Sequence, residues 1–207
     1  MAIIPQSYYQ SMDVLGLSKD LLGKYLVSNV GGKFTAGMIV ETEAYRAPDD
    51  KACHAYANKR TPRTETMFAI GGTCYVYICY GIHNLFNIVT APEGIAHAIL
   101  VRAIDPSDGL DIMEKRRKMP ISKKASCNGP GKFTRCMDIT KAQNGIDLSS
   151  KHSPLWIEDR GVKIAKKNII KGPRVGMSTA EECAHWPWRF RIKNNKWTSK
   201  PDLVKYK

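Results

Sequence analysis

The sequence predicts a mixed α/β (α+β) fold with a mostly antiparallel sheet. Apolar or alternating runs of strand length recur along the chain, as in residues 34–45 and 96–104. Short glycine-containing connections, Gly31–Gly32 and residues 81–84, leave no room for a parallel crossover between the strands that they join. The 207 residues are 43% hydrophobic and contain no Ser- or Gly-rich linker, so we expect one compact domain over residues 1–207.

Short helices and strands are expected in turn along the chain. In the first half they are a helix over 18–22 capped by Ser18, strands over 24–30 and 34–45 joined at Gly31–Gly32, a polar stretch over 49–72 with a helical turn near Met67, and strands over 74–80, 85–90 and 96–104. In the second half they are a helix from Ser107 to Lys118 ended by Pro120, a short helix from Pro130, and strands over 155–159, 162–167 and 188–193.

The net charge of +13 is concentrated late in the chain. Residues 1–110 hold 9 basic and 10 acidic side chains, residues 111–159 hold 10 and 6, and residues 160–207 hold 13 and 3. This asymmetry predicts a polyanionic partner. The late basic residues alternate with Trp and Phe and form no amphipathic helix, which favours nucleic acid over a membrane surface. A basic surface that only aids solubility is the alternative.

Neither export nor a metal site is expected. Residues 1–10 lack the basic start and apolar stretch of a signal peptide, and no apolar run reaches the ~18 residues of a membrane span. We therefore expect an intracellular protein, cytoplasmic in a bacterium or nuclear in a eukaryote. Six cysteines occur without a CxxC motif, and the five histidines do not cluster with them, so we expect free thiols and no metal or other cofactor.

Two carboxylates in the run Ile39–Tyr45 are the first candidates for chemistry. Strand alternation places Glu41, Glu43 and Tyr45 on one face. An edge strand with a solvated acidic face is the commoner meaning of such a pattern. The functional interpretation is a general base beside an aromatic platform, because a base that activates water needs a partly desolvated site.

Five further residues stand out by their type and place. In residues 73–80, Tyr77 and Tyr80 alternate onto opposite faces, so they cannot share one role, although packing of a half-buried sheet would also explain the tyrosines. Arg102 interrupts an apolar run and needs an acidic or carbonyl partner, as a structural ion pair or as part of a site. Asn87 needs buried hydrogen bonds, whether as an anchor or as a pocket wall. His54 lies in a polar loop, where histidines are usually exposed.

Several motifs together resemble one family. They are LSKDLLGKYLV (17–27), ETEAY (41–45), PDDKACH (48–54), RTPR (60–63), MF (67–68), YVYICYGIHNLFN (75–87), LVRAIDP (100–106) and CNGPGK (127–132), followed by the stretch around Trp188 and Trp197. Their order and spacing are similar to those of the alkyladenine (3-methyladenine) DNA glycosylases over nearly the whole chain. The chain differs from the family's usual pattern at Thr64, at residues 69–72 and at Cys53.

The resemblance implies a fold, a reaction and a set of roles. It implies a curved sheet with a protruding β-hairpin, and a base-excision-repair enzyme that flips alkylated or deaminated purines (3-methyladenine, hypoxanthine and, as a further candidate, ethenoadenine) out of double-stranded DNA. The implied roles are general base for Glu43, water holder for Arg102, base contacts for Tyr45, His54, Tyr77 and Asn87, and DNA-intercalating wedge for Tyr80.

The expected reaction is hydrolysis of the N-glycosidic bond by a water that Glu43 activates. The enzyme is expected to be monofunctional, because no amine is placed to form an imine, and to act as a monomer. The rivals are a non-catalytic nucleic-acid-binding module, a bifunctional glycosylase/lyase and a small-molecule nucleoside hydrolase. The module explains the positive charge but gives no reason for Glu43 beside a pocket.

Overall fold

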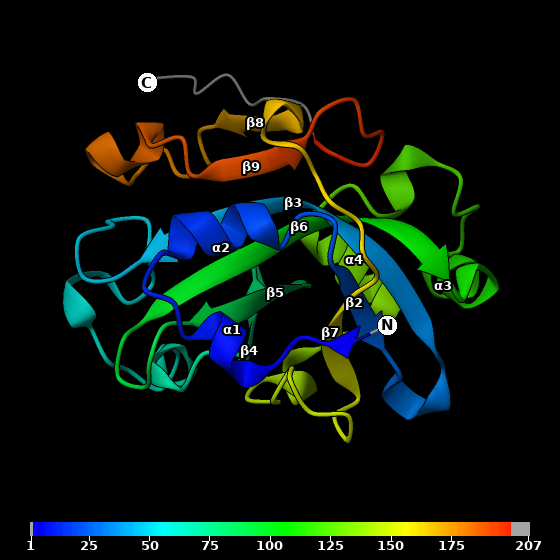
Figure 1. Ribbon diagram of the computed structural model, residues 1–207, viewed down its shortest axis with the longest axis horizontal. Coiled ribbons are helices and arrows are strands. Elements are labelled where there is room, and N and C mark those ends of the chain that lie inside the picture. The colour runs from blue at the N-terminus through cyan, green and yellow to red at the C-terminus, as the bar shows by residue number, and fades with distance from the viewer. Residues whose placement is uncertain (1, 200–207) are drawn as a thin grey trace.

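The computed structural model describes residues 2–199, which form a curved sheet with helices packed on it (Figure 1). The strands are β1 (Ala2–Ile3), β2 (Tyr25–Ser28), β3 (Thr35–Arg46), β4 (Cys74–Cys79), β5 (His83–Thr90), β6 (His97–Asp108), β7 (Leu155–Asp159), β8 (Ile169–Gly172) and β9 (Arg189–Ile192). They are ordered β1-β7-β2-β3-β6-β5-β4, and β9 pairs with both β3 and β8. Every pair within the described residues is antiparallel. The predicted mixed α/β class with a mostly antiparallel sheet is confirmed.

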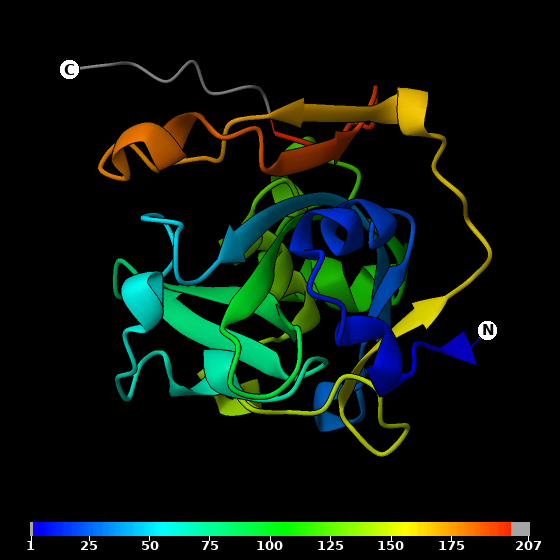
Figure 2. The same cartoon turned by 60° about the vertical axis from the view of Figure 1, so that its left-hand side comes forward.

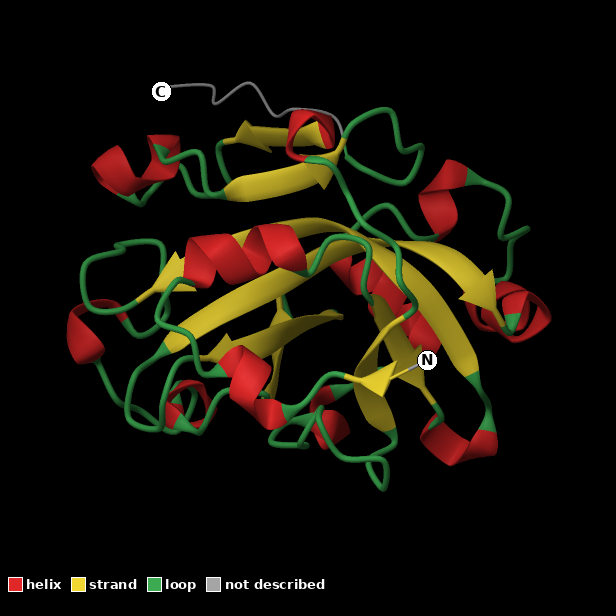
Figure 3. Cartoon of the chain, in the orientation of Figure 1, coloured by secondary structure: helices red, strands yellow, loops and turns green. Residues whose placement is uncertain are grey.

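Short helices and loops complete the fold. The α-helices are α1 (Gln6–Tyr9), α2 (Val14–Asp20), α3 (Leu110–Arg117) and α4 (Pro130–Met137). Single 3-10 turns occupy Val30–Gly32, Tyr56–Asn58, Glu65–Phe68, Lys124–Ser126, Lys141–Gln143, Lys166–Asn168 and Glu181–His185. The stretch between β3 and β4 is loop apart from two of these turns (Figure 3). The turn at Glu65–Phe68 is the one predicted near Met67, and the turn at Tyr56–Asn58 was not predicted.

The two long strands β3 and β6 form the centre of the sheet. Their pairing skips Val40 on β3 and Arg102 on β6, so each strand carries a bulged residue next to Glu41. Bulges re-aim side chains and often lie beside functional sites. Glu41 and Glu43 are both fully buried, because β3 is flanked by β6 on one side and by β2 and β9 on the other. The edge-strand alternative for these carboxylates is therefore wrong.

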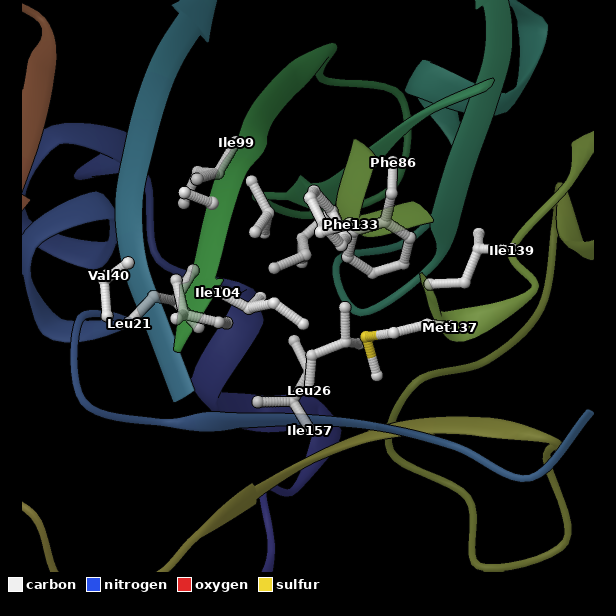
Figure 4. Close-up of a cluster of buried hydrophobic side chains, with 14 of the residues drawn as sticks. Leu21, Leu26, Val40, Phe86, Ile99, Ile104, Phe133, Met137, Ile139 and Ile157 are labelled. Carbon is white, nitrogen blue, oxygen red and sulfur yellow. The ribbon is translucent and has the colours of Figure 1, made fainter. Parts of the chain in front are cut away.

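One large apolar cluster joins the sheet to its helices (Figure 4). Ile104 from β6 and Phe86 from β5 pack with Phe133 of α4, and the Phe86 and Phe133 rings meet edge to face at 6.5 Å. Leu26 of β2 and Ile157 of β7 extend the cluster toward the other end of the sheet. This packing makes the central strands a rigid support for the polar side chains that they carry.

Two predicted helix boundaries and one predicted strand are wrong. The helix predicted from Ser18 is α2, which begins at Val14, because Asp13 caps it by accepting from the N–H of Gly16 at 2.7 Å. Ser107 lies in β6, which pairs as far as Asp108 with β3, and the helix α3 begins only at Leu110. No strand forms over 162–167; this segment crosses from β7 to β8 (Figure 2), and residues 169–172 pair with β9 instead.

No helix within residues 2–199 has both the length and the apolar character needed to cross a bilayer.

A pair of glycines tests how tightly β3 and α3 meet. Gly109 has a φ of +68° before α3, and a Cβ there would collide with the carbonyl oxygen of Phe34. Gly145 has a φ of +88° with nothing within 4 Å of such a Cβ. Gly145→Ala should cost only the left-handed strain of about 1–2 kcal/mol, and Gly109→Ala distinctly more. Urea unfolding of both variants measures this; equal losses would contradict the close approach.

Candidate active site

The centre of the site is a carboxylate pair on β3 facing an arginine on β6. Arg102 donates from Nε to Glu41 Oε1 at 3.0 Å, and its Nη1 lies 3.3 Å from Glu43 Oε1. Its side chain is 10% exposed, while both glutamates are fully buried. The predicted acidic partner of Arg102 is thus present twice. Because Arg102 sits on the bulge of β6, it reaches both carboxylates from one position.

Glu41 belongs to a closed structural network rather than to the open side of the site. It also accepts from Arg189 Nε at 2.7 Å, and from the backbone N–H and hydroxyl of Ser199, both at 2.7 Å. Burial alone would raise the pKa of Glu41, but Arg102, Arg189 and Ser199 together lower it below its usual value. Glu41 therefore stays ionised and holds Arg102 in place.

Glu43 is held by three groups from three segments. Besides Arg102, the hydroxyl of Tyr45 donates to Oε2 at 2.8 Å and the backbone N–H of Val175 donates to Oε1 at 2.7 Å. Burial and the nearby Glu43 raise the pKa of Tyr45 well above its usual value, so its phenol keeps the proton that it donates. The predicted sharing of one face by Glu43 and Tyr45 is confirmed.

A buried ion pair anchors the segment that brings Val175 to Glu43. Arg174 bonds both oxygens of Asp50 at 2.5 and 2.7 Å, and neither side chain has exposed surface. It also donates to the carbonyls of Ala44 and Cys183, at 2.8 and 3.0 Å. Its guanidinium stacks on the ring of Tyr45, 4.8 Å from the centroid. One arginine thus connects β3, the loop that follows it and the C-terminal part of the chain.

An aromatic pocket opens beside Glu43. Its lining is Tyr45, Ala52, His54, Met67, Tyr75, Tyr77, Asn87, Ala98 and Met177. Within it, the rings of His54 and Tyr77 meet at 4.6 Å, and those of Tyr75 and Tyr77 at 5.5 Å. Such a cavity offers π faces to a planar ligand. Asn87 is buried and donates from Nδ2 to the carbonyls of Tyr75 and Leu85, at 3.1 and 3.3 Å. These contacts are the buried hydrogen bonds that were predicted for Asn87.

His54 is half-buried and neutral, unlike a usual loop histidine. Its Nε2 lies 3.2 Å from a guanidinium nitrogen of Arg63, and its Nδ1 lies 3.0 Å from the hydroxyl of Tyr75. Because a guanidinium only donates, Nε2 accepts and the ring proton sits on Nδ1. Burial and the charge of Arg63 lower the pKa of His54 to about 4.

Tyr80 stands at the tip of the β4–β5 hairpin with 89% of its surface exposed. It has a φ of +50° and is followed by Gly81 at +73°, and the N–H of Ile82 donates to the carbonyl of Cys79 at 3.2 Å. Two successive positive φ angles are typical of type I′ hairpin turns, which favour Asn and Gly. A tyrosine is strained there and contributes almost nothing to packing, which points to a role outside the fold.

A groove runs from the hairpin tip to the pocket. Tyr80, Arg102 and Glu43 line it, together with residues 128–132 at the start of α4. Tyr45 and Tyr77 line both the groove and the pocket, whereas His54 and Asn87 line only the pocket. The structure therefore brings the seven predicted site residues into one continuous hollow, with Tyr80 at its outer end.

Basic side chains flank the hairpin on both sides. Arg117, Lys132 and Arg135 line a hollow beside His83, and Arg63 and Lys141 line another beside Ile78. The aromatic-basic stretch near the C-terminus does not form the nucleic-acid-binding surface that was predicted from it. Its Trp188, Phe190 and Trp197 are buried in the core, as are Arg189 and Arg191.

Sequence reasoning missed residues 174–177, which are far from the other site residues in the sequence but lie at the site. Val175 and Met177 border the groove, and Arg174 pairs with Asp50 across 124 positions. The only available signal was an arginine within Gly172–Gly176, a segment whose two glycines and proline indicate a constrained turn. Within residues 2–199, no group of three or more His, Cys, Asp or Glu side chains is placed to hold a metal ion.

Comparison with known proteins identifies the family. The sequence profile described as methylpurine-DNA glycosylase matches residues 7–196. The chain belongs to the methylpurine-DNA glycosylase family. Proteins named "Putative 3-methyladenine DNA glycosylase" from Bacillus cytotoxicus and Chlamydia felis are 42% and 44% identical to it, over 95% and 92% of this chain and 98% and 96% of their own. One from Bacillus mycoides is 43% identical, over 95% of this chain and 98% of its own. As a member of the family, the chain is a DNA glycosylase, a hydrolase of base excision repair.

The neutral His54 predicts that this glycosylase loses stability in mild acid. Between the unfolded pKa of 6.5 and the folded pKa of about 4, the unfolded chain binds a proton that the folded chain does not. The unfolding free energy is therefore unaffected by His54 above pH 6.5 and decreases as the pH falls toward 4. The decrease reaches about 2 kcal/mol at pH 5.

His54→Gln should shrink the difference in unfolding free energy between pH 7 and pH 5 by about that amount. Urea unfolding at both pH values measures it. His152→Gln, at an exposed histidine, serves as the control. An unchanged pH dependence in His54→Gln would show that His54 is not held neutral.

Proposed function

We propose that this chain excises alkylated and deaminated purines, namely 3-methyladenine, hypoxanthine and ethenoadenine, from double-stranded DNA by flipping them into the pocket. The observation that carries the proposal is the position of Glu43. Its carboxylate lies where the groove meets an aromatic pocket, and Tyr45, Val175 and Arg102 hold it in place. The relatives' names support the substrate class.

Glu43 acts as the general base of a dissociative hydrolysis. The bond between the base and the sugar carbon breaks, its electron pair leaves with the purine, and the sugar becomes an oxocarbenium-like cation. Water then adds to this carbon and gives its proton to Glu43, whose charge also stabilises the cation. A guanidinium has five N–H donors, so Arg102 keeps donors for that water after bonding Glu41 and contacting Glu43.

The pocket recognises a planar base. Tyr45, Tyr77 and His54 stack on it, with each stacked ring contributing about 1–3 kcal/mol, and a cationic purine such as 3-methyladenine gains cation–π attraction. Asn87 helps to reject guanine by its exocyclic amino group. An N-alkylated purine already leaves readily, whereas a neutral base such as hypoxanthine needs protonation.

The hairpin and its basic flanks bind the duplex. Tyr80 enters the stack and fills the space that the flipped nucleotide vacates, which offsets part of the cost of extrusion. Phosphate contacts from the side chains on either side of the hairpin are independent of sequence, which suits a monomer that scans DNA.

Strand cleavage is not part of the proposed reaction. Lys132 is an amine that lines the groove, but its ammonium donates to Asn128 Oδ1 at 3.0 Å. Because this contact engages the Lys132 amine and a water activated by Glu43 is the proposed nucleophile, we expect no imine intermediate.

Glu43→Gln tests the catalytic role. The amide keeps the size of the side chain but cannot take a proton, so release of hypoxanthine and 3-methyladenine should fall by at least about 100-fold. Single-turnover base release and DNA binding are measured together on duplexes that carry the lesion. Binding should persist, because Glu43 contributes no positive charge. Base release at the wild-type rate would refute Glu43 as the base.

Tyr80→Asn separates the stability of the hairpin from its function. Asn suits the left-handed position better than Tyr, so the unfolding free energy should rise by about 0.5–1 kcal/mol. Excision from the duplex should fall because the wedge is lost. Tyr80→Phe keeps the ring and should match wild type in both urea unfolding and excision. A Tyr80→Asn variant of full activity would remove Tyr80 from the mechanism.

A further inference from the structure

Three residues border both the groove and the pocket: Tyr45, Tyr77 and Met177. A base that leaves the duplex at the groove must pass between them to reach His54 and Asn87, which line only the pocket. We propose that Met177 is a specificity-determining residue that sets the size of the base admitted through this opening. The inference rests on the proposed function, because it needs a flipped base to enter.

The two tyrosines of the opening are fixed. Tyr45 is bonded to Glu43 at 2.8 Å, with Arg174 stacked on its ring at 4.8 Å. Arg174 does not line the pocket, so it supports Tyr45 from outside. Tyr77 packs against His54 and Tyr75 inside the pocket, and the guanidinium of Arg63 lies 5.2 Å from its ring centroid. Neither ring can move without breaking several contacts.

Met177 is the adjustable member of the opening. It is half-buried, and its sulfur lies 4.0 Å from the Tyr45 hydroxyl, whose single proton is already directed to Glu43. The sulfur contact is therefore packing rather than a directional bond. An unbranched thioether with three rotatable bonds adapts its shape to what it contacts, so the volume at this position determines how wide the opening can become.

The backbone that carries Met177 is anchored just before it. Arg174 is tied to Asp50 and two carbonyls, and the N–H of Val175 is bonded to Glu43. Gly176 then takes a φ of +74°, and a Cβ there would meet nothing within 4 Å. A substitution at Met177 therefore changes the opening while the contacts of Glu43 stay in place.

Size selection is tested with a two-ring and a three-ring base. Single-turnover excision of hypoxanthine and of ethenoadenine is measured from otherwise identical duplexes, for wild type, Met177→Ala, Met177→Phe and Met177→Leu. Met177→Ala should raise the ratio of ethenoadenine to hypoxanthine excision about tenfold, and Met177→Phe should lower it by a similar factor. Met177→Leu conserves the volume and should stay within about twofold of wild type.

The outcomes distinguish this inference from the proposed function. Wild type that releases neither base would refute the proposed function and the role of Met177 with it. Wild type that releases these bases, with a ratio unchanged in both Met177→Ala and Met177→Phe, would refute Met177 alone. A ratio that moves in opposite directions in the two variants, with urea unfolding as in wild type, supports Met177 as the size-determining residue.

Discussion

Glu41 and Glu43 lie two residues apart on the central strand β3, and both carboxylates are fully buried. A buried charge is tolerated only when it is paired and hydrogen-bonded, so Glu41 and Glu43 require partners from elsewhere in the chain. Arg102 comes from β6, Arg189 from β9, and the N–H of Val175 from the segment before β9. The strand β9 pairs with β3 at residues 41–43, directly beside these carboxylates.

The two glutamates have different roles. Glu41 is enclosed by two arginines and Ser199 and serves to orient Arg102. Glu43 has the same burial but borders the groove, where its charge can act on a substrate. One arginine shared by two carboxylates explains why the β6 ladder skips Arg102: on a regular strand the side chain would have a single neighbour across the sheet.

Local patterns in the sequence predicted much of the site and less of what supports it. Alternation along a strand was enough to place Glu43 with Tyr45, and an arginine in an apolar run was enough to require an acidic partner. The hairpin followed from a glycine between two strand-like runs. The bulge at Arg102 depends on pairing between strands, and the ion pair of Arg174 with Asp50 joins positions far apart in the sequence. Neither feature can be predicted from the periodicity of a single segment. The buried Trp188 and Trp197 show the opposite error, because aromatic residues among basic ones were interpreted as surface.

Arg174, Val175 and β9 come late in the chain, so the site cannot be completed early during synthesis. A chain emerging from the ribosome presents β3 long before these residues exist, and domains tend to assemble from the N-terminal side during synthesis. Until the last strand pairs with β3, Glu43 lacks its backbone donor and Asp50 lacks its arginine. Before then, only Arg102 can pair with the two carboxylates of β3, and the site is complete only after residues 174–199 have been synthesised.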